Sequence, residues 1–249
     1  MSEPFIQFID VHKSFGDNTV LSGINLSIHQ GEITAVIGRS GTGKSVLLKH
    51  IIGLIHQDSG KLLINGKPLD RMDKKAMHGF HKDVSYMFQD NALFDFLTVY
   101  ENIALPLTEK KQKNKIDIPG KVAEKMKILG LSGTEHKYPA QLSGGMRKRV
   151  ALARALITDP KAVLFDEPTT GLDPIRRNNI HDMIAQYQSQ FGFTAVIVSH
   201  DIPEIFHITQ HIAMLDKGKI IFEGSTEEIR HSHNDIVNSF IRGKEHRAL

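Results

Sequence analysis

The stretch "EITAVIGRSGTGKSVLLKHIIGL", residues 32–54, decides the fold. Residues 32–38 form a short apolar run rich in β-branched side chains, which predicts a buried strand. The last part has apolar residues at helical spacing before Gly53, which predicts a helix that stops there. Between them, "GRSGTGKS" matches the pattern G-x-x-x-x-G-K-[S/T], so the stretch predicts a strand, a glycine-rich loop and a helix in that order.

This order predicts a phosphate-binding loop. Glycines let the backbone approach phosphate oxygens, and the start of the following helix adds unpaired N–H groups and a positive dipole end. Lys44 is expected to reach the β- and γ-phosphates, and Ser45 to supply an oxygen to Mg²⁺. The alternative, a glycine-rich turn with an accidental lysine, does not explain the flanking strand and helix. We therefore expect a nucleoside triphosphate to be bound by Gly38, Arg39, Ser40, Gly41, Thr42, Gly43, Lys44 and Ser45.

The rest of the chain indicates a parallel α/β sheet. Short buried strands are predicted at residues 84–89, 161–167 and 193–201, with a helix at 175–188. Strands that alternate with helices favour parallel pairing. Apolar alternation predicts antiparallel strands at residues 5–11 and 19–28.

Other segments add helices and a hairpin. From about residue 91 to 142 the pattern changes to helices broken by glycine, proline and lysine, which predicts a helical insertion. Near the C-terminus, Lys217-Gly218 predicts a hairpin turn, and Ser225 with Glu228 predicts a capping box. No internal repeat or low-complexity segment is present.

Two adjacent carboxylates, Asp166 and Glu167, end the predicted strand at residues 161–167. This strand end faces the ligand crevice in an α/β sheet. Asp166 is expected to orient Mg²⁺, and Glu167 to polarise the attacking water. An acidic junction between a strand and a turn is the alternative, and the nearby phosphate loop argues against it.

Composition excludes several classes. The 249 residues include no cysteine, so disulfides and thiolate metal sites are excluded. The 14 histidines are scattered without HExxH spacing, and we expect most of them at the surface. A net charge of +3 is small for a nucleic-acid-binding protein, and the basic run at residues 109–115 is expected to be solvated. Without a signal peptide or an apolar run of about 18 residues, any membrane role is expected to be peripheral.

From "HKSFG" (residues 12–16) to "GKIIFEGS" (218–225), the motifs resemble the nucleotide-binding subunits of ABC transporters in order and spacing. The resemblance implies a P-loop NTPase fold with an antiparallel β subdomain and an α-helical subdomain. It places the RecA-like core and β subdomain at residues 1–90 and 158–224, the helical subdomain at 91–157 and a helical tail at 225–249. It also implies a head-to-tail homodimer that encloses two ATP molecules with Mg²⁺.

The resemblance assigns roles to four further residues. Phe15 matches the aromatic residue that stacks on adenine, and Gln89 the glutamine that reaches Mg²⁺ and the attacking water. His200 matches the histidine at the γ-phosphate, and Asp173 the aspartate that communicates across the dimer. Taken alone, Phe15 fits a core or turn position, Gln89 a strand end, His200 a structural histidine, and Asp173 a helix N-cap ahead of Pro174.

The stretch "QLSGGMRKRVALARAL", residues 141–156, matches the family's signature motif. Ser143, Gly144 and Gly145 open a helix whose unpaired N–H groups can hold an anion. The resemblance places them against the γ-phosphate bound by the other subunit. Along the helix, Val150, Leu152 and Ala153 are expected to pack inward. The basic residues Arg147, Lys148 and Arg149 are expected to solvate one face.

Met146 stands where most family members have glutamine. This residue, the segments after Gln89 and His200, and the tail at 234–243 resemble the ATPase of the maintenance-of-lipid-asymmetry (Mla) group of Gram-negative bacteria. That resemblance implies phospholipid transport at the cytoplasmic face of the inner membrane, with an Mla-type permease, an MCE substrate-binding protein and a STAS-domain protein as partners. Leu93, Phe94 and Phe96 would anchor the permease or, alternatively, belong to the helical core.

Three alternatives use the same ATPase chemistry. The chain could serve a small-solute importer or a cell-division system. A DNA-repair or ribosome-associated ATPase is disfavoured, because those proteins usually carry two cassettes or long insertions, and no nucleic-acid partner is expected.

Overall fold

Two β-sheets carry the fold, and the computed structural model describes residues 4–89, 92–108 and 117–243. The larger sheet has the strand order β10 (Lys219–Ser225), β9 (His211–Asp216), β3 (Ile33–Ile37), β8 (Thr194–Ser199), β7 (Ala162–Asp166) and β6 (Val84–Met87). Each pair of neighbouring strands from β9 to β6 is parallel, whereas β10 pairs with β9 in the antiparallel direction. The predicted parallel α/β sheet is therefore confirmed.

The central strands β3, β7 and β8 are buried along their whole length. Successive side chains point to opposite faces of a sheet, and each face here has its own core. Ile33, Ala35 and Ile37 belong to one cluster, and Val36 to the other. Apolar runs without polar alternation are what a doubly covered parallel sheet requires.

The smaller sheet is antiparallel, with the order β2 (Asn18–Ile28), β1 (Ile6–Phe15), β4 (Ser59–Ile64) and β5 (Lys67–Pro68). The two antiparallel strands expected near the N-terminus are therefore confirmed. The sequence did not predict β4, because its first three residues are exposed and leave only a short apolar pattern. It also missed helix α2 (Lys74–Asp83), in which Phe80 is the one buried residue.

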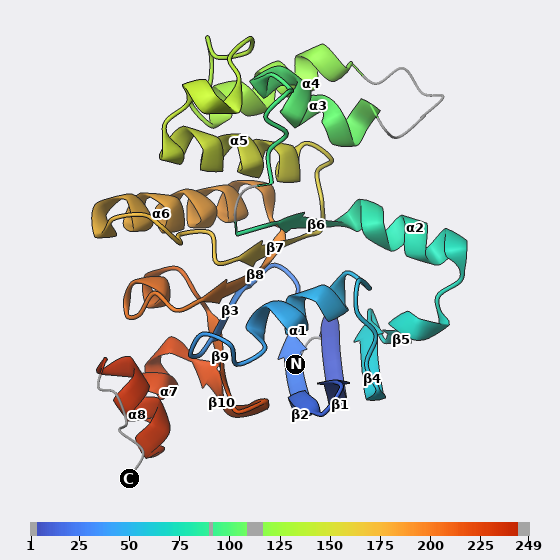
Figure 1. Cartoon of the computed structure of the whole chain (residues 1–249), viewed down its shortest axis with the longest axis vertical. Helices are drawn as coiled ribbons and strands as arrows, with labels where there is room; N and C mark the ends of the chain where they lie inside the picture. The colour runs from blue at the N-terminus through green and yellow to red at the C-terminus, as the bar shows by residue number, and fades with distance from the viewer. Residues whose placement is uncertain (1–3, 90–91, 109–116, 244–249) are drawn as a thin grey trace.

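Helices cover both faces of the larger sheet. The remaining α-helices are α1 (Lys44–Ile51), α3 (Val99–Thr108), α4 (Ile118–Ile128), α5 (Gly144–Leu156), α6 (Pro174–Phe191), α7 (Thr226–Arg230) and α8 (Asp235–Ile241). Helix α1 packs in one core together with both sheets, and α3 to α6 contribute to the other. Figure 1 shows α3, α4 and α5 together at one end of the molecule, and α7 and α8 beside the C-terminal strands. Short 3₁₀ turns lie at η1 (Leu69–Arg71), η2 (Pro139–Gln141) and η3 (Glu204–His207).

Local signals in the sequence have the structures they predicted. Lys217 and Gly218 both have positive φ, 45° and 75°, and join β9 to β10 as a hairpin. Ser225 and Glu228 form the capping box of α7. Asp173 caps α6 by accepting a hydrogen bond from the Arg176 N–H at 3.0 Å.

One expectation about polar residues was wrong. Lys148 was expected on a solvated face of the helix with Arg147 and Arg149, but it is only 4% exposed. Val150, Leu152 and Ala153 pack inward as expected. Consecutive residues of a helix point in directions about 100° apart, so three basic residues in a row cannot all lie on one narrow face. Because α5 is covered on several sides, one of the three is buried. Most of the described histidines are exposed or partly exposed, as expected, and only His50 and His181 among them are buried.

No helix in the described ranges is long and apolar enough to cross a membrane. The basic run at residues 109–115 lies outside the described residues.

Gly60 allows β4 to lie against β1. It has a φ of +86°, and a Cβ there would lie 2.1 Å from the Asp10 carbonyl oxygen. Gly66 has a similar φ of +72° with open space around it. We expect Gly60→Ala to lower the free energy of unfolding by about 1–3 kcal/mol more than Gly66→Ala, because only the first change adds a steric clash to the backbone strain. Chemical denaturation of both variants measures the difference, and equal losses would contradict the packing described for β1 and β4.

Candidate functional site

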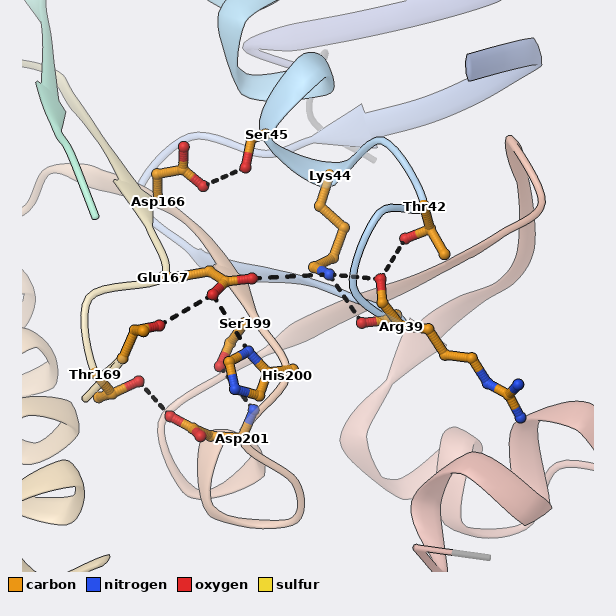
Figure 2. Close-up of polar contacts among 12 residues, drawn as sticks. Arg39, Thr42, Lys44, Ser45, Asp166, Glu167, Thr169, Ser199, His200 and Asp201 are labelled. Carbon is orange, nitrogen blue, oxygen red and sulfur yellow. Dashed lines mark hydrogen bonds and ion pairs between the residues drawn. The ribbon is translucent and has the colours of Figure 1, made fainter. Parts of the chain in front are cut away.

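Three loops meet at the carboxyl edge of the larger sheet (Figure 2). The glycine-rich loop follows β3, and His200 and Asp201 follow β8. Asp166 ends β7, and Glu167 is the next residue. Strand β8 pairs in parallel with both β3 and β7, so all three loops leave the sheet on the same side. The arrangement matches the ligand crevice of an open α/β sheet.

Lys44 lies at the centre of this edge and is only 4% exposed. Its Nζ donates to the carbonyl oxygens of Gly38 and Arg39, each at 2.9 Å, and lies 3.9 Å from Glu167 Oε1. Burial lowers the pKa of Lys44, while the nearby carboxylates of Glu167 and Asp166 act in the opposite direction. The glycine-rich loop thus wraps around its own lysine.

Gly38 has a packing role that the sequence did not indicate. A Cβ at this position would lie 2.2 Å from the backbone oxygen of Leu215 in β9. The first glycine of the motif is therefore required by the neighbouring strand. Farther along the loop, Thr42 Oγ1 donates to the Arg39 carbonyl oxygen at 2.8 Å and tightens the turn.

Asp166 joins the phosphate loop to β6. Its Oδ1 accepts a hydrogen bond from Ser45 Oγ, and its Oδ2 accepts one from Tyr86 OH, each at 2.7 Å. Burial, then the bond to Asp166, raises the pKa of Tyr86 and keeps its hydroxyl protonated as a donor. The hydroxyl and carboxylate oxygens of Ser45 and Asp166 form a donor set that suits Mg²⁺, which completes its shell with phosphate and water.

Glu167 has a left-handed backbone with a φ of 47°. Such a conformation costs about 1–3 kcal/mol in a residue with a Cβ and is often found at functional sites. Its N–H donates to the Val198 carbonyl at 3.0 Å, and its Oε2 accepts from Thr170 Oγ1 at 2.9 Å and lies 3.3 Å from His200 Nδ1. The carboxylate is thereby directed toward Lys44 (Figure 2).

Phe15 and Gln89 are less closely tied to this edge. Phe15 ends β1, is 48% exposed, and has Lys13 Nζ 5.4 Å from its ring centroid. Gln89 lies two residues beyond β6 with an exposed side chain, and among the described residues no hydrogen bond joins it to Asp166 or Glu167. A cavity of about 320 Å³ borders the phosphate loop and is lined by Asn18, Thr19, Val20, Arg39, Ser40, Gly41, Thr42, Asp216, Lys217 and Gly218.

Helix α5, which Ser143 caps, lies apart from helix α1, which begins at Lys44. Figure 1 shows α5 and α1 separated by α6 and by strands β6 to β8. Ser143 caps α5 by accepting a bond from the Met146 N–H at 3.3 Å. A cavity of about 260 Å³ extends from there to the start of α6 and is lined by Ser143, Gly145, Met146, Arg149, Leu172, Arg176, Asn179 and Ile180. One chain therefore does not bring its own Ser-Gly-Gly motif to its own phosphate loop.

Sequence reasoning missed Tyr86, Thr169, Thr170, Arg177 and Asp201 as members of this site. Tyr86 lies in a strand that was predicted, and Thr169 and Thr170 follow the two carboxylates. Asp201 follows His200. For Thr169, Thr170 and Asp201, closeness in sequence to motif residues was the only available signal.

Comparisons with known proteins agree with this geometry. The family described as ABC transporter matches residues 21–170. The Escherichia coli "Intermembrane phospholipid transport system ATP-binding protein MlaF" is 36% identical over 94% of this chain and 87% of its own length. The Haemophilus influenzae protein of the same name is 33% identical over 98% and 92%. The Mycobacterium leprae "Probable ribonucleotide transport ATP-binding protein mkl" is 37% identical over 93% of this chain. The match covers 67% of the length of that relative and 65% of the length of the Mycobacterium tuberculosis protein of the same name.

Solved structures share the fold. A Clostridium perfringens protein, cbiO1, described as part of the ABC transporter complex cbiONQ, superposes with a TM-score of 0.84 at 28% identity, over 97% of this chain and 96% of that one. A dimeric ATP-binding cassette in a post-hydrolysis state, bound to ADP and Pi, superposes with a TM-score of 0.78 at 30% identity, over 89% and 98%.

Tyr86→Phe tests the support of Asp166. We expect the variant to fold and to need a several-fold higher Mg²⁺ concentration for half-maximal ATP hydrolysis, because Asp166 loses one of its two hydrogen-bond donors while keeping its charge. Titrating Mg²⁺ at fixed ATP measures the effect. Tyr187→Phe is the matched control, because it removes a tyrosine hydroxyl that donates to the Ile128 carbonyl at 2.6 Å, outside the site. An unchanged Mg²⁺ requirement in Tyr86→Phe would refute this role.

Proposed function

This chain belongs to the ABC transporter family and acts as an ATPase, and from that premise we propose that it drives phospholipid transport in an Mla-type system. The observation that carries the proposal is the similarity to the two MlaF proteins over nearly their whole lengths. The mycobacterial ribonucleotide-transport relatives are as similar in sequence but extend well beyond the region matched here. Their similarity keeps a solute importer as the second candidate.

The arrangement of the carboxyl edge supports roles for each residue in ATP hydrolysis. Lys44 and the N–H groups of the glycine-rich loop bind the phosphates, and Phe15 stacks on the base. Ser45 and Asp166 would hold Mg²⁺, with Gln89 reaching the site on closure. The ion would neutralise phosphate charge. Glu167 accepts a proton from the attacking water, and His200, 3.3 Å from that carboxylate, binds the γ-phosphate.

A head-to-tail dimer would complete two such sites. The start of α5 offers helix N–H groups and a positive dipole end, which suit a phosphate. In one chain α5 lies apart from α1 and its phosphate loop, so Ser143, Gly144 and Gly145 would serve the nucleotide of the other subunit. Asp173, at the start of α6, would lie at the same interface, in keeping with the dimeric cassettes that share the fold.

A second surface suits the permease. A cavity of about 370 Å³ is lined by Ser85, Tyr86, Phe88, Ala92, Phe94, Leu105, Pro106, Arg154 and Ala155. Phe94 and Phe96 are 43% and 75% exposed, whereas Leu93 packs against the core. Exposed aromatic side chains at a cavity are typical anchors for a partner. We assign this surface to an Mla-type permease in the inner membrane, with the chain on the cytoplasmic side and MCE and STAS-domain proteins in the same assembly.

Purification of the chain with its native membrane partner tests the cargo. We expect mass spectrometry to find bound phospholipid and an MCE-domain protein in the assembly. Recovery of a permease bound to a nucleotide, sugar or amino acid would instead support the solute importer. A permease-free complex with nucleic acid would refute both.

Glu167→Gln tests the hydrolytic role. We expect the variant to bind ATP with nearly unchanged affinity, to accumulate as an ATP-bound dimer, and to lose at least about 100-fold in turnover, because the amide cannot accept the water proton. Size-exclusion chromatography with ATP and a phosphate-release assay measure these effects. Glu124→Gln, which changes an exposed carboxylate on α4 outside the three loops, is the control. Undiminished hydrolysis in Glu167→Gln would remove Glu167 from this role.

A further inference from the structure

We propose that Asp201 is a positioning residue for ATP hydrolysis, which fixes Glu167 and His200 relative to each other by binding Thr169 and Arg177. The inference rests on the roles proposed above for Glu167 and His200. It adds a side chain that need not contact nucleotide or water and acts through its neighbours.

Asp201 is a buried carboxylate with partners on both oxygens. It is 4% exposed. Its Oδ2 accepts a hydrogen bond from Thr169 Oγ1, and its Oδ1 accepts one from Arg177 Nη1 at 2.7 Å. Its N–H donates to Ser199 Oγ at 3.0 Å. Burial alone would raise the pKa of Asp201, but the bonds from Thr169 and Arg177 hold it below its usual value, so the carboxylate is charged at neutral pH.

These bonds close a ring through the hydrolysis site (Figure 2). Thr169 lies two residues after Glu167, and Asp201 directly follows His200. His200 Nδ1 lies 3.3 Å from Glu167 Oε2, which closes the ring on the side of the reacting groups. The bond from Thr169 to Asp201 closes it on the buried side. Displacement of the loop after β7 relative to the turn after β8 would therefore break at least one of these contacts.

The ring is needed because Glu167 has a strained backbone. A left-handed residue with a Cβ persists only where its surroundings hold it in place. The N–H of Glu167 is held by the Val198 carbonyl in β8, and the bond from Thr169 to Asp201 ties the following turn to the end of the same strand. Without this second attachment, the loop is free to relax and to move the Glu167 carboxylate away from His200.

Arg177 connects the same carboxylate to helix α6. It lies one helical turn after Asp173, which caps the helix and lies at the proposed dimer interface. Because a helix moves as a rigid element over one turn, a shift of its first residues reaches Asp201 through the guanidinium. Asp201 is thus the point at which the partner-facing end of α6 and the two reacting side chains are joined.

Thr169→Val is the decisive variant, because it keeps the side-chain shape and removes the bond to Asp201. In the transporter assembly we expect kcat for ATP hydrolysis to fall at least about tenfold, since small misplacements of catalytic groups have large effects on rate. We expect KM and the Kd for ATP to stay within about twofold, because the phosphate loop is untouched. Thr169→Ser keeps the hydroxyl and should recover most of kcat.

Thr134→Val is the matched control. Thr134 is also a buried threonine, and its Oγ1 donates to the Leu131 carbonyl at 2.6 Å, outside the site. We expect this variant to lose thermal stability with an unchanged kcat. Asp201→Asn and Asp159→Asn form a second pair, since Asp159 binds Lys121 and Lys125 at 2.6 and 2.9 Å. Only the Asp201 variant should lower kcat.

Two results would overturn the inference. One is a kcat in Thr169→Val that falls no further than in Thr134→Val. The other is a fall that comes with an equal rise in the Kd for ATP, which would mark a binding role. Glu167→Gln in the same assembly separates this failure from that of the proposed function. If Glu167→Gln is inactive but Thr169→Val is normal, Asp201 has no positioning role, whereas an active Glu167→Gln refutes the assigned chemistry itself.

Discussion

Strand β8 lies between β3 and β7 and pairs in parallel with both, and the geometry of the functional edge depends on this pairing. In register, Ile37 lies opposite Ser199, and Asp166 lies opposite Val198. Parallel hydrogen bonding fixes where each strand ends, so the loops that carry Lys44, Glu167 and His200 start close together. The burial of all three strands on both faces stabilises this register, because a slip would move apolar side chains out of their cores.

The edge also buries charges, and each of them has polar partners. Lys44 is held by loop carbonyls, Asp166 by Ser45 and Tyr86, and Asp201 by Thr169 and Arg177. A buried charge is costly unless hydrogen bonds compensate it, so these contacts restrict each group to one position. The site is therefore organised by its own polar contacts, and electrostatic preorganisation of this kind is a main source of catalysis.

The proposed permease surface and the nucleotide site share a side chain. The Tyr86 ring lines the cavity that borders Phe88 and Phe94, while its hydroxyl donates to Asp166. Helix α5, by contrast, lies apart from α1 and the phosphate loop of the same chain. One subunit thus presents a complete phosphate loop with its carboxylates, the neighbouring surface proposed for the permease, and a signature helix directed elsewhere.

The sequence by itself determined the features that depend on neighbouring residues. These were the strand, phosphate loop and helix around Lys44, the parallel α/β class, the carboxylates at the end of β7, and the caps at Asp173 and Ser225. Tertiary structure decided contacts between distant segments. Ser45 and Tyr86 reach Asp166 across 121 and 80 residues, and Thr169 reaches Asp201 across 32. Such contacts leave no periodic signal in the chain, because they depend on how whole strands and helices pack. The same reason explains why Lys148 is buried, since the faces of α5 that are covered depend on its neighbours.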